Sequence, residues 1–374
     1  MVWELFKYET YKIVHSRLTI IVLSLMVILS VIMGLPLGQS KQTKDVHREM
    51  ESMNGRLFDN KLMKEMTEAI GDRADPDWNP GTWKYVGFES MASAVLPTVE
   101  NKYTADDFYR IREQNLNKSM AESFLAEKEM LWWKGKEKKV EKPFTFTAAY
   151  NARTLTDYMS NIVLLALLLA AICLSTVFAS EHRSGMDQLI LSARHGRSKT
   201  FAAKLIAGFV FILIWTAICA AMLTLTVYLN NGLGGLKAIV QMEVPNSAYP
   251  MTFLQFYGIQ MLILFSAAVL FAAIAMTFSE LTRNGVAVMG LMIGLYIVIF
   301  IINVPKSYRV ISQSIAMLPT ELINIWSLMD HRLINIFGNY YSMFTLSPMI
   351  YLIMTVILCM IARKAYMRYQ VGGK

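Results

Sequence analysis

The sequence predicts an all-α polytopic membrane protein, with six transmembrane helices and a mainly helical extracytoplasmic domain between the first and second spans. Only 17% of the 374 residues are charged, against about 25% in a typical soluble domain. Hydrophobic residues make up 55% of the chain, and they gather into six apolar runs. An α-helix rises about 1.5 Å per residue, so about twenty residues cross the hydrocarbon layer of a bilayer.

The six apolar runs are expected to be helices, because lipid offers the backbone no hydrogen bonds. They are Leu18–Leu37, Asp157–Ala179, Ala202–Leu229, Phe253–Phe278, Val286–Val304 and Ser347–Ile361. The last run is short but gains length from the apolar pair before it, residues 343–344. The first run is too long for a signal peptide and lacks a small-x-small cleavage site, so we expect an anchored span.

The charge distribution predicts the orientation. With the N-terminus in the cytoplasm, the cytoplasmic pieces are residues 1–17, 180–204, 279–285 and 362–374. They hold 13 Lys and Arg against 5 acids, whereas the rest of the chain has 23 of each, so the formal charge of +8 lies on one side. The positive-inside rule therefore predicts a multi-pass protein of the cell membrane with both termini cytoplasmic. The basic balance reflects topology and does not indicate nucleic-acid binding, since no nucleic-acid-binding motif accompanies it.

The first polar piece, residues 1–17, mixes aromatic and charged side chains. Trp3, Tyr8 and Tyr11 alternate with Glu4 and other charged residues, which predicts an amphipathic helix on the inner membrane surface. Span one then covers residues 18–37.

Residues 38–156 form the predicted extracytoplasmic domain. Asp45–Ile70 has apolar residues at largely helical spacing. Thr104 is placed to cap a second helix, whose first turn holds Asp106 and Asp107. We expect the Met and Trp residues of this domain to pack as a core rather than to line a ligand groove.

The second half of the chain is divided by its spans. Residues 157–304 hold spans two to five, residues 305–346 are expected to form short or re-entrant outer helices, and residues 347–374 hold span six and a basic cytoplasmic tail. Asp330, His331 and Arg332 are adjacent, and we interpret them as a salt-bridged cluster at the outer surface rather than as a substrate gate.

Motifs for catalysis and for cofactor binding are missing from the sequence. The stretch GRSKT is not a phosphate-binding loop, because Arg197 follows Gly196 where that loop needs lysine and no glycine stands five positions earlier. No metalloprotease or serine-hydrolase motif occurs, and the five histidines are scattered. We therefore predict no catalytic, cofactor-binding or metal-ligating residue in this chain.

The inner loop between spans two and three carries a recognisable pattern. In FASEHRSGMDQLILSARHGRSKTFAAKLIAG (residues 178–208), Glu181, Arg183 and Gly185 fit a Glu-x-Arg-x-Gly opening, a short leucine-rich helix follows, and Lys204 enters span three. With the six-span topology, this stretch resembles the permease subunits of ABC type-2 exporters. Ala193-Arg194 stands where those permeases often have Thr-Pro.

The resemblance implies that residues 180–204 form a coupling loop, in which Met186–Ser192 is a helix seated against a separate ABC ATPase subunit. The implied contact residues are Glu181, Arg183, Gly185, Met186, Leu189, Ile190, Leu191, Arg194, Arg197 and Lys199. ATP and Mg²⁺ would bind to that partner, and the permease would pair with a second copy, the same chain or a paralogue, in the lipid bilayer.

The resemblance and the apolar spans together imply export of a hydrophobic or amphipathic substrate, such as a peptide antibiotic, a drug or a lipid. The alternative is a membrane receptor or sensor, in which the extracytoplasmic domain detects a ligand and a partner carries the signal. An intramembrane enzyme is disfavoured, because the spans hold almost no ionisable residue beyond Asp157.

Overall fold

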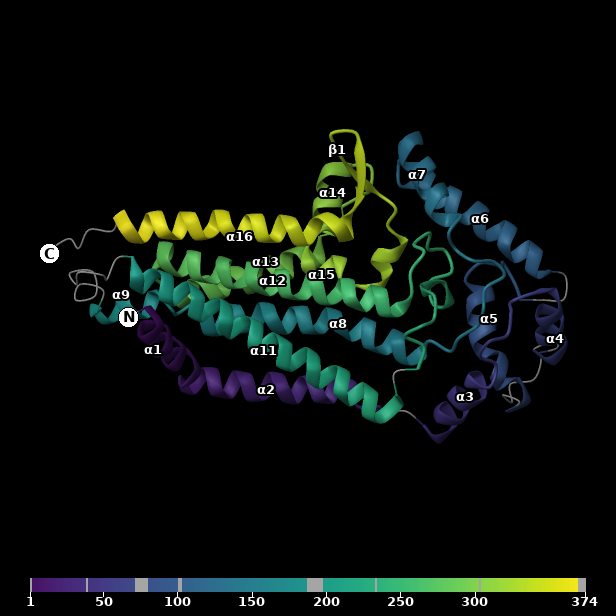
Figure 1. The fold of residues 1–374 in the computed structure, drawn as a ribbon, viewed down its shortest axis with the longest axis horizontal. Coiled ribbons are helices and arrows are strands. Elements are labelled where there is room, and N and C mark those ends of the chain that lie inside the picture. The colour runs from purple at the N-terminus through teal and green to yellow at the C-terminus, as the bar shows by residue number, and fades with distance from the viewer. Residues whose placement is uncertain are drawn as a thin grey trace.

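The computed structural model describes residues 2–37, 40–70, 80–99, 103–186, 198–232, 234–302 and 304–368. The molecule is elongated: long helices form a bundle at one end, and short helices form a separate domain at the other (Figure 1). The start of α1 (Val2–Val14) and the end of α16 (Met343–Arg368) lie together at the bundle end, far from the domain of short helices.

Five helical segments in the described part of the chain are long and apolar enough to cross a membrane. They are α2 (Arg17–Gly34), α8 (Tyr150–Leu169) with its extension through η2 (Ala170–Leu174) and α9 (Ala179–Ser184), α11 (Lys199–Asn231), α12 (Phe253–Thr282) and α16. The helix α13 (Gly285–Ile301) is equally apolar but has only 17 residues. The prediction of a helical polytopic membrane protein is confirmed.

The central helix of the bundle is α12, which packs against α8, α11, α13 and α16. It begins with a capping box, in which Thr252 and Gln255 each accept a hydrogen bond from the other's backbone N–H. Farther along, the buried Gln260 amide donates to Thr156 O at 2.9 Å and to Ile323 O at 2.7 Å. These bonds satisfy the Gln260 amide nitrogen in an apolar setting, and they tie α12 to α8 and to the segment just after α15 (Pro319–Leu322).

The span boundaries differ from the prediction, most clearly at α8 and α16. The helix α8 begins at Tyr150, seven residues before Asp157, and α16 runs from Met343 to Arg368 rather than from Ser347 to Ile361. Hydropathy marks only the part of a helix that lipid surrounds, whereas backbone hydrogen bonding continues into the polar flanks. Asp157 therefore lies inside α8, where it pairs with Arg153 on the preceding turn at 3.4 Å.

The segment between α2 and α8 is a compact helical unit, called here the insert domain (residues 40–149). Its helices are α3 (Lys41–Glu51), α4 (Asn60–Ile70), η1 (Pro80–Tyr85), α5 (Val86–Ser93), α6 (Ala105–Glu122) and α7 (Glu127–Glu137). Its core is aromatic: Phe58, Phe88, Phe108, Phe144 and Trp133 are fully buried.

The predicted helical stretch Asp45–Ile70 is in fact two helices, because the chain turns at Gly55, with φ +86°, before α4. The predicted cap at Thr104 is confirmed: its hydroxyl accepts from the Asp107 N–H, and the Asp107 carboxylate accepts from the Thr104 N–H.

The region before α16 contains the short helices that were predicted and a β-hairpin that was not. It comprises α14 (Arg309–Ala316), α15, η4 (Ile325–Met329), β1 (Leu333–Ile336) and β2 (Asn339–Ser342), and η3 (Val240–Met242) lies in the loop before α12. The hairpin turns at Phe337 and Gly338, with φ values of +50° and +87°. Two-residue hairpin turns favour asparagine and glycine at such angles, and a phenylalanine there gives no recognisable signal.

Candidate functional site

The second long helix is interrupted just before the predicted coupling loop. Regular α-helix gives way to the π-helical turn η2 and then to turns at residues 175–178, before α9 begins. The backbone N–H groups of Phe178 and Ala179 donate to Ser279 Oγ of α12, at 3.3 and 3.1 Å. Gly185, with φ +69°, ends α9 in a left-handed conformation that glycine adopts without strain. Thus α9 is a separate short helix that is fixed to α12 at its start.

A network of charged side chains, buried except at Lys12, joins α9 to α1 and α11. Lys204 of α11 is completely buried, and its Nζ donates to Glu9 Oε2 at 2.8 Å and to Glu181 Oε1 at 2.5 Å. The same Glu181 oxygen accepts from Lys12 Nζ at 2.9 Å. Two carboxylates and two ammonium groups therefore meet, and we call these four residues the ion network. Its opposite charges compensate one another, which a group of buried ions requires.

The ion network keeps the Lys12 ammonium charged. Burial lowers the pKa of Lys12, but the hydrogen bond to Glu181 and the charges of Glu181 and Glu9 outweigh burial, so its pKa is raised. The Lys204 ammonium also lies 5.9 Å from the centre of the Phe178 ring, whose face attracts a cation.

Two further contacts bring α12 and α16 to the same place. His182 Nε2 of α9 lies 3.2 Å from Glu280 Oε2 of α12, and both side chains are almost fully buried. The rings of Phe178, Phe201 and Tyr366 pack together, with centroids 5.3 to 5.7 Å apart. Five helices therefore converge on the base of the loop that joins spans two and three.

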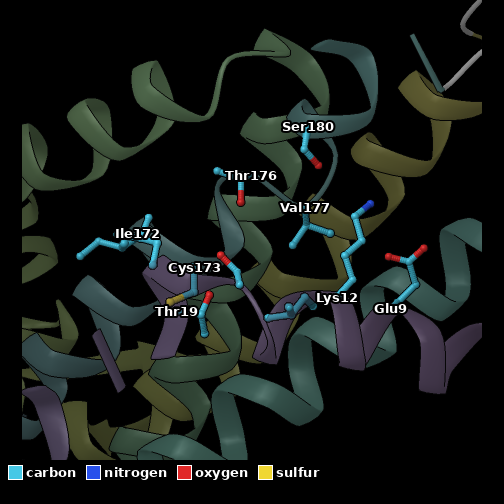
Figure 2. A pocket seen from close by; sticks show the side chains of 11 residues that line it. Glu9, Lys12, Thr19, Ile172, Cys173, Thr176, Val177 and Ser180 are labelled. Atoms are coloured by element: carbon cyan, nitrogen blue, oxygen red, sulfur yellow. The ribbon is translucent and has the colours of Figure 1, made fainter. Parts of the chain in front are cut away.

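A pocket of about 200 Å³ opens beside the ion network. Figure 2 shows Glu9 and Lys12 of α1 with Ile172 and Cys173 of η2 and Ser180 of α9. The interrupted stretch thus borders this pocket on one side, and its other side chains are buried against neighbouring helices. Helix interruptions of this kind recur where a helix bends or moves.

The predicted contact residues differ in how exposed they are, and half of them lie outside the described residues. Arg183, Gly185 and Met186 are exposed, Lys199 is half-buried, and Glu181 is buried with 6% exposed and bonded within the chain. Leu189, Ile190, Leu191, Arg194 and Arg197 lie outside the described residues. Glu9 and Lys12 were missed by the sequence reasoning, although they lie three residues apart on the face of α1 that also buries Ile13.

At the opposite end, the prediction for Asp330, His331 and Arg332 is correct in its pairing and wrong in its location. Arg332 binds the Asp330 carboxylate through Nε at 2.9 Å, so the salt bridge exists. However, His331 is fully buried and Arg332 is 3% exposed. The Arg332 guanidinium also donates to Ser312 Oγ at 2.7 Å, and Trp133 Nε1 donates to His331 O at 2.5 Å. The trio is an internal junction under the insert domain.

The fold and the site define a multi-pass helical membrane protein whose loop between the second and third long helices is anchored by buried charges. The family model described as "ABC-2 family transporter protein" matches residues 3–361, and the chain belongs to that family, the membrane permeases of ABC transporters. No curated protein and no solved structure matched the chain.

Proposed function

We propose that this chain is the permease subunit of an ATP-driven exporter, and that a separate ATPase subunit drives it through residues 180–204. The observation that carries the proposal is the ion network at the base of that loop, in a chain matched by the ABC-2 family model from residue 3 to 361. A loop whose base is bonded to three helices suits the transmission of movement better than a loop that only connects two spans.

The contacts suggest a route for that movement. A displacement of α9 would reach α1 through the bonds of Glu181 and Lys204 to Lys12 and Glu9. It would reach α12 through Ser279, which accepts the two N–H groups at the start of α9. The bundle helices would then shift as packed bodies and open a path for the substrate.

In this proposal α13 is the sixth span. Its 17 residues extend over about 25 Å, so a slight local thinning of the bilayer accommodates it. The insert domain and residues 305–342 then lie outside the cell, and the positively charged loop and both termini lie in the cytoplasm, in agreement with the charge distribution.

The proposed cargo is hydrophobic or amphipathic. An almost wholly apolar cavity of about 230 Å³ lies among α8, α12, α13 and α15, lined by Phe271, Met292 and Tyr296 among others. A cavity of this lining favours an apolar group over a charged one. ATP and Mg²⁺ would be held by the ATPase subunits, two of which would serve two permease copies.

The proposal is tested by co-purification from the native membrane. We expect an ATPase subunit to accompany the tagged chain, and replacement of both Leu189 and Ile190 by aspartate to abolish that association. Leu131→Asp is the matched control, because Leu131 is 59% exposed on the insert domain, at the other end of the molecule. An unchanged yield of ATPase with the double variant would contradict the coupling role, and co-purification of a kinase alone would favour the receptor hypothesis.

A further inference from the structure

A second cavity lies where the insert domain meets the start of α8. Its volume is about 400 Å³, within the range of sites for drug-sized molecules. It is bounded by α3, α5, residues 146–149, the first turns of α8, and the end of η3 with Glu243. Thr43, Ser90 and Thr154 stand on its walls and are partly or fully exposed, so the cavity opens to the surroundings.

One side of this cavity is aromatic and apolar. The rings of His47 and Tyr150 are stacked with centroids 3.6 Å apart, and Met50 and Phe146 are buried beside them. Gly87 allows this packing, because a Cβ there would lie 2.7 Å from Phe146 Cζ. The cavity therefore has a preformed apolar wall, which an apolar ligand group can cover without displacing side chains.

The other side is lined by Glu243 and Arg153, and two further carboxylates outside the lining are bonded to residues of the wall. The Arg153 guanidinium is shared by two of them: it lies 2.8 Å from Glu243 Oε2 and 3.4 Å from Asp157 Oδ2. A third carboxylate, Glu51, accepts from the neutral Tyr150 hydroxyl at 2.7 Å. The bonded group thus holds three carboxylates and one guanidinium, with Glu243 and Arg153 at the cavity wall.

The pKa shifts agree with an under-neutralised site. Burial raises the pKa of Glu243, even though Arg153 acts to lower it. Burial also lowers the pKa of His47, so its imidazole is neutral at pH 7 and adds no positive charge. A cationic group that entered the cavity would relieve the cost of the buried Glu243 charge.

We propose that this cavity binds an organic cation with an apolar body. The cationic group would lie against Glu243, and the apolar body would cover the Tyr150 ring, whose face also attracts cations. The insert domain and the bundle would thereby form the binding site together, so the insert domain would do more than cover the end of the bundle. This inference concerns the isolated chain and does not depend on the ATPase.

The test compares two fluorophores that share one ring system, cationic rhodamine 6G and anionic fluorescein. Fluorescence anisotropy is followed as each is titrated with the purified full-length chain in detergent micelles. We expect rhodamine 6G to bind saturably and fluorescein to bind at least about tenfold more weakly, the effect of reversing one charged contact.

Two variants locate the binding. Glu243→Gln is expected to weaken rhodamine 6G binding about tenfold, and Ser90→Trp, at an exposed wall position, to block it by filling the cavity. Glu68→Gln, on the exposed side chain that pairs with Lys64, is the charge-matched control and should bind as the unaltered chain does. Thermal unfolding checks that each variant folds. If Glu243→Gln fails to fold, Ser90→Trp still tests the proposal. Equal binding of both fluorophores, or unchanged binding by Ser90→Trp, would overturn the proposal.

Discussion

The two ends of the molecule both bury charge, but they use different cations. At the bundle end the ion network is built on lysine, and Lys204 Nζ donates to the carboxylates of Glu9 and Glu181. At the insert-domain end the buried cation is Arg112, which binds Glu137 and also donates to the backbone oxygens of Pro245 and Ser247, at 2.5 and 2.8 Å.

A second arginine repeats the pattern at the insert-domain end. Arg309 of α14 binds Glu129 of α7 through both terminal nitrogens and donates to Phe124 O and Leu333 O, each at 3.2 Å. Burial raises the pKa of Glu129, but the bonds from Arg309 and from two backbone N–H groups outweigh burial, so its pKa is lowered. The insert domain is thus fixed to the segment that carries α14 and the hairpin.

The difference follows from the geometry of the two side chains. A guanidinium is a planar fork with five N–H donors, so it fixes several acceptors, including backbone, in one arrangement. An ammonium is a compact charge whose three donors rotate, and it keeps its carboxylate partners while the helices that carry them shift. The guanidinium contacts therefore fix the insert-domain end in one arrangement, whereas the ammonium contacts of the bundle end tolerate more than one.

The largest effect is expected from Lys204→Met. It leaves Glu9 buried without the ammonium to which it is bonded, and loss of one partner from a buried ion pair costs about 3 to 5 kcal/mol of unfolding free energy. Urea-induced unfolding of the purified protein in micelles measures the loss. Lys199→Met is the matched control on the same helix, where a half-buried lysine should cost about 0.5 kcal/mol.

A double variant shows whether charge is the cause. Adding Glu9→Gln to Lys204→Met removes the uncompensated carboxylate, so part of the lost stability should return. Additive losses from the two substitutions would show that packing, not charge pairing, is what Lys204 provides.

The next effect is a pH dependence of folding stability that arises at the insert-domain end, from His331. Burial lowers the pKa of His331 to about 4 from an ordinary 6.5. The unfolded chain therefore takes up a proton below pH 6.5 and the folded chain only near pH 4, so stability falls across that window as pH falls, by at most about 3 kcal/mol. Protonation would also oppose the contact in which the Ala248 N–H points at His331 Nε2, at 3.4 Å.

This dependence is measured as the free energy of unfolding at several pH values between 7 and 4.5. Trp fluorescence monitors the unfolding, since Trp133 donates to the His331 carbonyl. His331→Gln removes the titrating group while the carboxylates of the chain titrate as before. The variant should lose less stability than the unaltered chain on acidification; equal losses would mean that His331 does not take part.

A smaller effect is expected from Arg112→Lys, which keeps the charge and removes the fork. The ammonium cannot reach Glu137 and both carbonyl oxygens together, so about 2 kcal/mol should be lost. Arg110→Lys, on an exposed arginine of the same helix, is the control and should change stability little. Unfolding of both variants in urea checks this, and an unaltered stability in Arg112→Lys would remove the distinction between the two ends.

Part of this organisation could be predicted from the sequence. The long apolar runs gave the order of the membrane helices, and the Thr104 cap was correct because capping depends on neighbouring residues alone. The hairpin at Phe337 and the interruption at Ala170–Leu174 were missed, since neither has a local pattern that distinguishes it. Within the candidate site, Glu181 and Lys204 were identified by a resemblance, but their partners Glu9 and Lys12 were not.

The sequence by itself determined that this is a helical membrane protein, because lipid forces every apolar run of sufficient length to satisfy its own backbone, and determined which end of the molecule carries the net charge. Only the tertiary structure decided which charges meet. Glu9 and Lys204 are 195 residues apart and Arg112 and Ser247 are 135 apart. Such pairs depend on the packing of whole helices, and nothing in the spacing of one segment reports where another segment will lie.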